Sequence, residues 1–177
     1  MNPYIALFRG INVGGNNILR MQDLRTLLED LGAQKVKTYI QSGNAVFQHQ
    51  NENSLELSSK IKAAIKDSHG FEPKVLLLSL AELAQAIAAN PYSQAEPEPK
   101  TLTEVPSNPD LALLNSLKKD AEAFTLTDKV FYLYAPDGIG RSKLAERVER
   151  TLRVATTARS WRTVGKVMAL AEEIWPY

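Results

Sequence analysis

Apolar residues recur along the chain at two spacings, which predict a repeated order of strands and helices. Short apolar runs predict strands at residues 4–8, 36–40, 45–48 and 74–78. Apolar positions three or four residues apart predict a helix over residues 21–31 and another around Leu57 and Ile61, between Asn53 and Gly70. The resulting β-α-β-β-α-β order is typical of a ferredoxin-like unit.

The second half of the chain repeats this order. Strands are expected at residues 100–105, 123–126, 130–134 and 154–156. One helix is expected to begin with Asn108 as N-cap and Pro109, another to contain Leu144 and Val148, and a last one to cover residues 161–174. The strands at 123–126 and 130–134 are expected to form a hairpin, with Tyr132 on the more solvent-exposed of its two faces.

The two repeats predict an α+β protein of two ferredoxin-like units in tandem, packed as one body. The sheets are expected to be antiparallel or mixed, with helices on one face. The first unit is expected to cover residues 1–79, and a linking helix and polar loop residues 80–99. The second unit, with the C-terminal helix, is expected to cover residues 100–177.

Composition removes several classes of function. The chain has no cysteine and two histidines, which excludes disulfides, thiolate metal sites and histidine-rich metal sites. No segment approaches the roughly 20 apolar residues that a membrane helix requires. We therefore expect a cytoplasmic protein without a membrane partner, a metal site or a bound cofactor; its oligomeric state is left open.

Charge is unevenly distributed although the formal net charge is only +1. Residues 90–128 carry three basic and seven acidic side chains, whereas residues 141–166 carry eight basic and two acidic ones. A balanced total can hide a basic surface, which would attract an anionic partner.

The stretch from Arg9 to Asn17 carries three glycines and three asparagines directly after the first strand. Glycines let a ligand approach the backbone, and clustered N–H groups ahead of a helix attract anions. The stretch matches neither the P-loop nor the dinucleotide fingerprint. The candidate ligand-binding residues are Arg9, Gly10, Asn12, Gly14, Gly15 and Asn16. The alternative is a tight loop whose asparagines stabilise turns and whose arginine pairs with a carboxylate.

Residues 41–44 predict a hairpin turn that adds Ser42 and Asn44 to the candidates. Strands one and three of a ferredoxin-like sheet are antiparallel neighbours, so we expect Asn44 to lie near Arg9. The simpler alternative is that the turn only connects two strands.

Arg141, Ser142 and Lys143 precede or begin a predicted helix, where cations oppose the helix dipole. A bound anion would explain them, and so would pairing with Asp137. Further along the helix, Arg147 and Arg150 continue a basic stripe. The pairs Glu146–Arg150 and Glu149–Arg153 favour a solvated face there.

Residues 157–163 place Arg159, Trp161 and Arg162 around the start of the last helix. The tryptophan could stack on a base while the arginines hold phosphates. Alternatively, Trp161 is a packing anchor.

Several motifs together resemble the "domain of unknown function 1697" family of bacterial proteins. They are LFRGINVGG at residues 7–15, MQDLR at 21–25, TYIQSGN at 38–44, GRSKL at 140–144 and TARSWRT at 157–163. The resemblance runs from about Tyr4 to Ala171 and implies the double ferredoxin-like architecture, without implying an activity. The family pattern has asparagine where this chain has Ser160, which affects any ligand contact by that amide.

The leading hypothesis is therefore binding of a phosphorylated or other anionic ligand, a nucleotide or nucleic acid, through the glycine-rich loops and arginines. One alternative is an enzyme acting on a small phosphorylated or carboxylated substrate. Its acid or base would be Asp23, Asp137, a lysine or a tyrosine, and the sequence does not choose among them. Another is a protein–protein interaction module, in which all the motif arginines would be salt-bridged within the fold.

Overall fold

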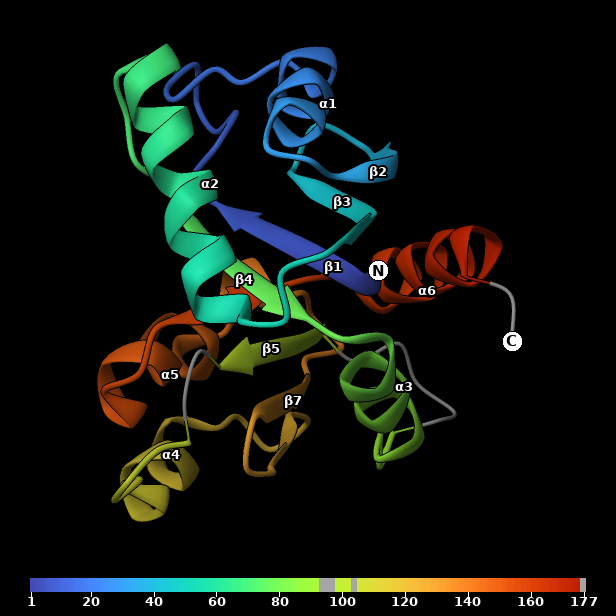
Figure 1. Cartoon of the computed structure of the whole chain (residues 1–177). Coiled ribbons are helices and arrows are strands. Elements are labelled where there is room, and N and C mark those ends of the chain that lie inside the picture. Colours follow the sequence, from blue (N-terminus) through green and yellow to red (C-terminus); the bar gives the residue numbers. More distant parts are fainter. Residues whose placement is uncertain (93–97, 103–104, 176–177) are drawn as a thin grey trace. The chain divides into compact units, whose positions relative to one another are not determined.

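Two four-stranded antiparallel sheets organise the chain (Figure 1). The computed structural model describes residues 1–92, 98–102 and 105–175, and only the backbone of 98–102. Contacts group the chain into one unit of Met1–Ile87 with Gly165–Tyr177 and a second unit of Ala88–Val164. These units differ from the predicted segments, which assigned the whole C-terminal helix to the second unit. The predicted loop 91–99 and strand 100–105 fall partly outside the described residues.

The first sheet has the strand order β2-β3-β1-β4. Its strands are β1 (Asn2–Arg9), β2 (Gln34–Tyr39), β3 (Asn44–His49) and β4 (Lys74–Leu78), and every neighbouring pair is antiparallel. The helices α1 (Met21–Asp30) and α2 (Ser54–His69) connect them, as the sequence predicted.

Alternating residues of β1 face opposite sides of the first sheet. Tyr4, Ala6 and Phe8 belong to a buried core with residues of α1 and α2, namely Leu24, Leu28, Leu57, Ile61 and Ile65. On the other side, Gln48 of β3 donates through Nε2 to the carbonyl oxygen of Ile174 at 2.8 Å. Ile174 ends α6 (Trp161–Ile174), so helices contact both faces of this sheet rather than the single predicted face.

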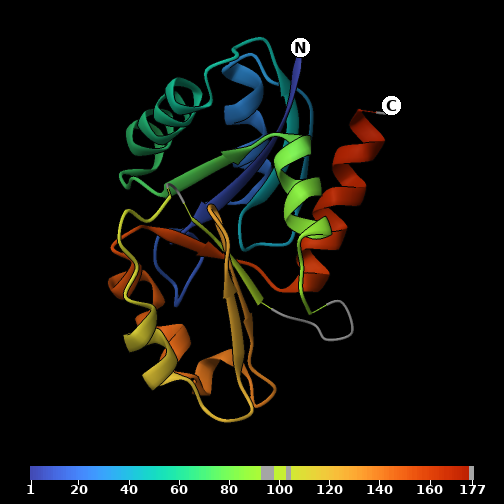
Figure 2. The ribbon, with the colours of Figure 1, turned by 90° about the horizontal axis from the view of Figure 1, so that it is seen from below.

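The second sheet has the strand order β6-β7-β5-β8 and is also antiparallel. Its strands are β5 (Glu98–Leu102), β6 (Ala123–Leu126), β7 (Val130–Tyr134) and β8 (Thr156–Ala158). The helices α4 (Leu111–Leu117) and α5 (Lys143–Leu152), with the short 3-10 helix η1 (Ile139–Arg141), lie between them in sequence. Helices α4 and α5 lie side by side (Figures 1 and 2) and share a core with Phe131 and Leu133 of β7.

Two local predictions in this unit are wrong. Helix α4 begins after Asp110, whose side chain accepts from the Leu113 N–H at 2.8 Å, and not after Asn108. Tyr132 is fully buried, and burial raises the pKa of its phenol. A phenol carries enough apolar surface to be buried on the second face of a strand.

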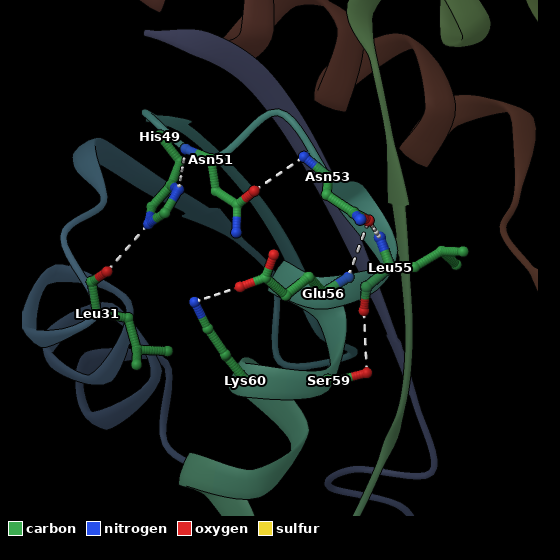
Figure 3. Close-up of polar contacts among 8 residues, drawn as sticks. All are labelled: Leu31, His49, Asn51, Asn53, Leu55, Glu56, Ser59 and Lys60. Atoms are coloured by element: carbon green, nitrogen blue, oxygen red, sulfur yellow. Dashed lines mark hydrogen bonds and ion pairs between the residues drawn. The ribbon is translucent and has the colours of Figure 1, made fainter.

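Side-chain caps define the starts of two helices in the first unit. Before α3 (Leu80–Ala88), Ser79 and Glu82 form a reciprocal capping box, with bonds of 2.9 Å and 3.2 Å. Before α2, Asn53 accepts from the N–H groups of Leu55 and Glu56, but its own N–H is bonded to the Asn51 side chain (Figure 3). The side chain of Glu56 forms an ion pair with Lys60. Within the described ranges, no helix is long and apolar enough to cross a bilayer.

Candidate functional site

The loop between β1 and α1 is held in place by the side chain of Asn12. Its amide nitrogen donates to the carbonyl oxygens of Leu19 and Gln41, both at 2.8 Å, and its amide oxygen accepts from the Leu19 N–H at 2.8 Å. Asn17 donates to the carbonyl oxygen of Gly10 at 2.7 Å. The amide of Asn12, a candidate ligand contact, is therefore used within the fold.

The tip of the same loop is exposed. Its backbone closes through a bond from the Asn16 N–H to the carbonyl oxygen of Val13 at 3.0 Å, and Gly14 and Gly15 both have positive φ. A Cβ at Gly10 or Gly15 would meet no described atom within 4 Å. The backbone of this tip therefore has open space around it.

The turn between β2 and β3 packs directly against this loop. The Phe8 N–H donates to the carbonyl oxygen of Gly43 at 2.8 Å, and a Cβ at Gly43 would lie 2.6 Å from Ile11 Cδ1. Asn44 is fully buried, and its amide nitrogen donates to the Tyr39 carbonyl oxygen and the Ser42 hydroxyl. Ser42 is exposed, whereas Asn44 stabilises the turn.

Arg9 is exposed at the end of β1 and lies directly opposite Lys74, the first residue of β4. Like charges at directly opposed positions in an antiparallel pair destabilise a sheet. Asn44 pairs with Leu7, so Arg9 lies two positions further along the same face, in the neighbourhood that strand pairing predicted. Lys74 was not foreseen, because its pairing with Arg9 depends on the register of two strands 65 residues apart in sequence.

In the second unit, the cations at the start of α5 surround a structural serine. Ser142 is buried and caps the helix by accepting from the Ala145 N–H at 3.0 Å. Arg141 and Lys143 on either side of it are exposed, and neither side chain forms an ion pair with a residue that the structure describes. The carboxylate of Asp137, their predicted alternative partner, lies 3.9 Å from Lys119.

The residues before α6 differ in environment. Arg159 donates to the carbonyl oxygen of Ala158 at 2.8 Å, and burial lowers the pKa of its guanidinium to about 10, so it is still charged at neutral pH. Trp161 is half-buried, whereas Arg162 is exposed and forms no ion pair within the described part of the chain. Ser160 accepts from the Thr163 N–H at 3.3 Å and helps to begin the helix.

Neither Asp23 nor Asp137, the two carboxylates considered as a catalytic acid or base, has an environment that distinguishes it as a catalytic group. Asp23 lies 4.0 Å from His69 Nε2, and Asp137 near Lys119; both are exposed. Across the described ranges, no three histidine, cysteine, aspartate or glutamate side chains are grouped to hold a metal ion. Among the candidate residues, Arg9, Arg141, Lys143 and Arg162 are exposed cations, whereas Asn12, Asn44 and Ser142 form hydrogen bonds within the fold.

Comparison with known proteins agrees with the architecture. A family model described as "protein of unknown function (DUF1697)" matches residues 1–132. The structure of the conserved bacterial protein SP0830 from Streptococcus pneumoniae is similar, with a TM-score of 0.73 and 25% sequence identity. That similarity covers 96% of this chain and 98% of the other. No curated protein matches the sequence significantly.

Proposed function

The chain belongs to the DUF1697 family of proteins of unknown function, and we propose that it binds a phosphate-bearing ligand, a nucleotide or nucleic acid, at the end of β1. The observation that carries this proposal is the direct opposition of Arg9 and Lys74 on adjacent strands. A phosphate beside this end of the sheet would be attracted to both side chains.

The chemistry of the two side chains suits a phosphate. The guanidinium of Arg9 can donate two parallel hydrogen bonds to one phosphate, and the ammonium of Lys74 can add a point charge. The accessible backbone around Gly14 and Gly15 would supply further N–H donors.

Arg141 and Arg162 in the second unit favour the hypothesis of an anionic ligand over that of a protein–protein interaction module. Such a module requires the motif arginines to be salt-bridged, but Arg141 and Arg162 form no ion pair with any described residue. Both side chains are exposed charges that can attract an anion.

We further assign each unit to the ferredoxin-like fold. The β-α-β-β-α-β element order supports this assignment. So does the strand order, in which the first and third strands of each unit are adjacent and central. In such a sheet β1 and β4 are antiparallel neighbours, so the last residue of β1, Arg9, lies beside the first residue of β4, Lys74.

The test compares two variants that remove the same charge. Arg9→Gln with Lys74→Gln removes the proposed contacts, whereas Arg25→Gln with Lys62→Gln removes two cations from α1 and α2. Binding of ATP and of a labelled single-stranded oligonucleotide is measured by fluorescence at about 50 mM salt. We expect affinity to fall at least about tenfold in the first variant, the loss for a hydrogen bond to a charged group, and to change little in the control.

Salt dependence separates the two ligand classes. If a nucleic acid contacts both cations, the slope of log affinity against log salt should become shallower by about 1.4–1.8 in the first variant. A nucleotide should show a shallower dependence in both proteins. The proposal fails if the unmodified protein binds neither probe, or if both double variants bind equally well.

A further inference from the structure

A cavity of about 300 Å³ lies between α4 and α5, within the second unit. Its walls have opposite character. Helix α5 and its C-cap contribute Arg147, Arg150 and Arg153, and helix α4 contributes Leu113 and Leu117. The volume is at the lower end of the range for small-molecule pockets.

The three arginines reach one cavity because of their spacing. Arg147 and Arg150 are three residues apart on α5, so their side chains are neighbours on the helix surface. Arg153 ends the helix with a left-handed backbone, φ 56°. Leu144 and Val148 of the same helix are buried in the core, which fixes the orientation of the helix.

The arginines are not neutralised by the pairs that the sequence predicted. None of the three forms an ion pair with a residue in the described ranges. Glu149 does not pair with Arg153; its carboxylate accepts from the N–H and hydroxyl of Thr156, at 3.4 Å and 3.2 Å. The lining carboxylate, Asp110, caps α4 through the Leu113 N–H. Three arginines and one carboxylate, which is engaged in a helix cap, therefore line this cavity.

The opposite wall is apolar and partly open to solvent. Leu113 and Leu117 are four residues apart on α4, on one face of the helix, and Leu113 is 44% exposed. A ligand that only carried charge would leave this leucine surface in water. The described lining contains no aromatic side chain on which a nucleobase could stack. Charge and apolar surface together indicate an amphipathic anion.

We propose that this cavity is a binding site for a small organic anion with a dianionic phosphate or dicarboxylate group on an apolar scaffold. The arginines hold the oxyanion through forked hydrogen bonds, and the leucines cover the apolar part. The site is independent of the Arg9–Lys74 site, since every residue that lines it belongs to the second unit.

The experiment uses four probes on the full chain: phenyl phosphate, phthalate, inorganic phosphate and benzyl alcohol. Binding is followed by NMR through the methyl signals of Leu113 and Leu117. Phenyl phosphate or phthalate should shift these signals with an affinity at least about tenfold above inorganic phosphate, from burial of the ring. Benzyl alcohol should cause no saturable shift. Comparison of the two bound dianions identifies whether the head group is a phosphate or a dicarboxylate.

Variants assign the binding to the cavity. Arg147→Gln with Arg150→Gln should weaken phenyl phosphate at least about tenfold, whereas Arg25→Gln with Lys62→Gln, which removes the same charge from the first unit, should not. Leu113→Asn should reduce phenyl phosphate to the affinity of inorganic phosphate while leaving inorganic phosphate unchanged. Arg9→Gln with Lys74→Gln should leave the methyl shifts intact, which separates this site from the proposed function.

Three results would overturn the proposal. In the first, no dianion shifts the leucine methyl signals of the unmodified protein. In the second, inorganic phosphate binds as tightly as phenyl phosphate. In the third, the Arg147→Gln and Arg150→Gln variant, with unchanged circular dichroism, retains full affinity.

Discussion

The side chain of Asn12 holds the main-chain carbonyl of Gln41 at 2.8 Å, although 29 residues separate them in sequence. Through its other bonds, to Leu19, the same side chain joins the loop after β1 to the turn between β2 and β3. One asparagine therefore sets the relative position of two motifs.

We predict that Asn12→Gly lowers the free energy of unfolding by about 2–3 kcal/mol, because three hydrogen bonds are lost at about 1 kcal/mol each. Glycine is chosen because Asn12 has a φ of 54°, which glycine adopts without strain. Asn17→Gly is the control, since Asn17 has a φ of 51° and donates one bond from its side chain. Urea unfolding of both variants measures the difference, and equal losses would contradict the assigned role.

Gly43 is the glycine at which space, as well as backbone conformation, excludes a side chain. We expect Gly43→Ala to lower stability by about 1–3 kcal/mol more than Gly70→Ala, the usual cost of overpacking. The two positions have similar φ, 80° and 76°, but a Cβ at Gly43 would lie 2.7 Å from Phe8 Cβ and one at Gly70 meets nothing within 4 Å. Thermal unfolding provides the comparison; a larger loss at Gly70 would refute it.

Ser142 acts in the structure as a helix cap. We predict that Ser142→Ala lowers the free energy of unfolding by about 1 kcal/mol and that Ser142→Gly lowers it by only a few tenths. The cause is the lost bond from the Ala145 N–H to the serine hydroxyl. If Ser142 instead serves mainly as a ligand contact, both variants will unfold like the unmodified protein and lose ligand affinity.

The pair formed by Glu56 and Lys60 predicts a pH dependence (Figure 3). A hydrogen bond from Lys60, then the lysine's charge, then a bond from Asn51 lower the pKa of the Glu56 carboxyl below its ordinary 4.5. A carboxyl whose pKa is lower in the folded protein stabilises it above the ordinary pKa, and this contribution is lost as pH falls through the lowered value.

Glu56→Gln should therefore reduce stability at neutral pH and make no difference once the carboxyl of the unmodified protein is protonated. Urea midpoints of the two proteins across the acid range measure this convergence. Because both side chains are exposed, added salt should shrink the difference at neutral pH. Divergence of the midpoints toward low pH would show that the sign is wrong.

The sequence predicted the element order and the nearness of Arg9 to Asn44, because both follow from local periodicity and a known strand pairing. It did not predict Lys74 opposite Arg9, since a register is determined by the packing of whole strands. The bonds of Glu149 to Thr156 were missed for a related reason. Helical spacing favours Arg153 as its partner, but tertiary structure offers polar groups that no spacing reveals.

The hydrogen bonds of the structure distinguish candidate residues that stabilise the fold from those that are available to a ligand. Asn12, Asn44 and Ser142 looked like ligand contacts because polar residues in loops serve both binding and folding. The structure engages each of them in the fold. Arg141, Arg162 and the arginines of α5 remain as charges without a described counterpart, and a sequence does not show which predicted ion pairs fail to form.

The return of α6 to the first unit also has a consequence for biosynthesis. The chain leaves this unit after Ile87 and re-enters it at Gly165, so the second unit is an insertion in sequence. During translation, the hydrogen bond of Gln48 to the main-chain oxygen of Ile174 cannot form until Ile174 has been added, 126 residues later. By then residues 88–164 of the second unit have been synthesised, whereas the first sheet still lacks the helix that contacts Gln48.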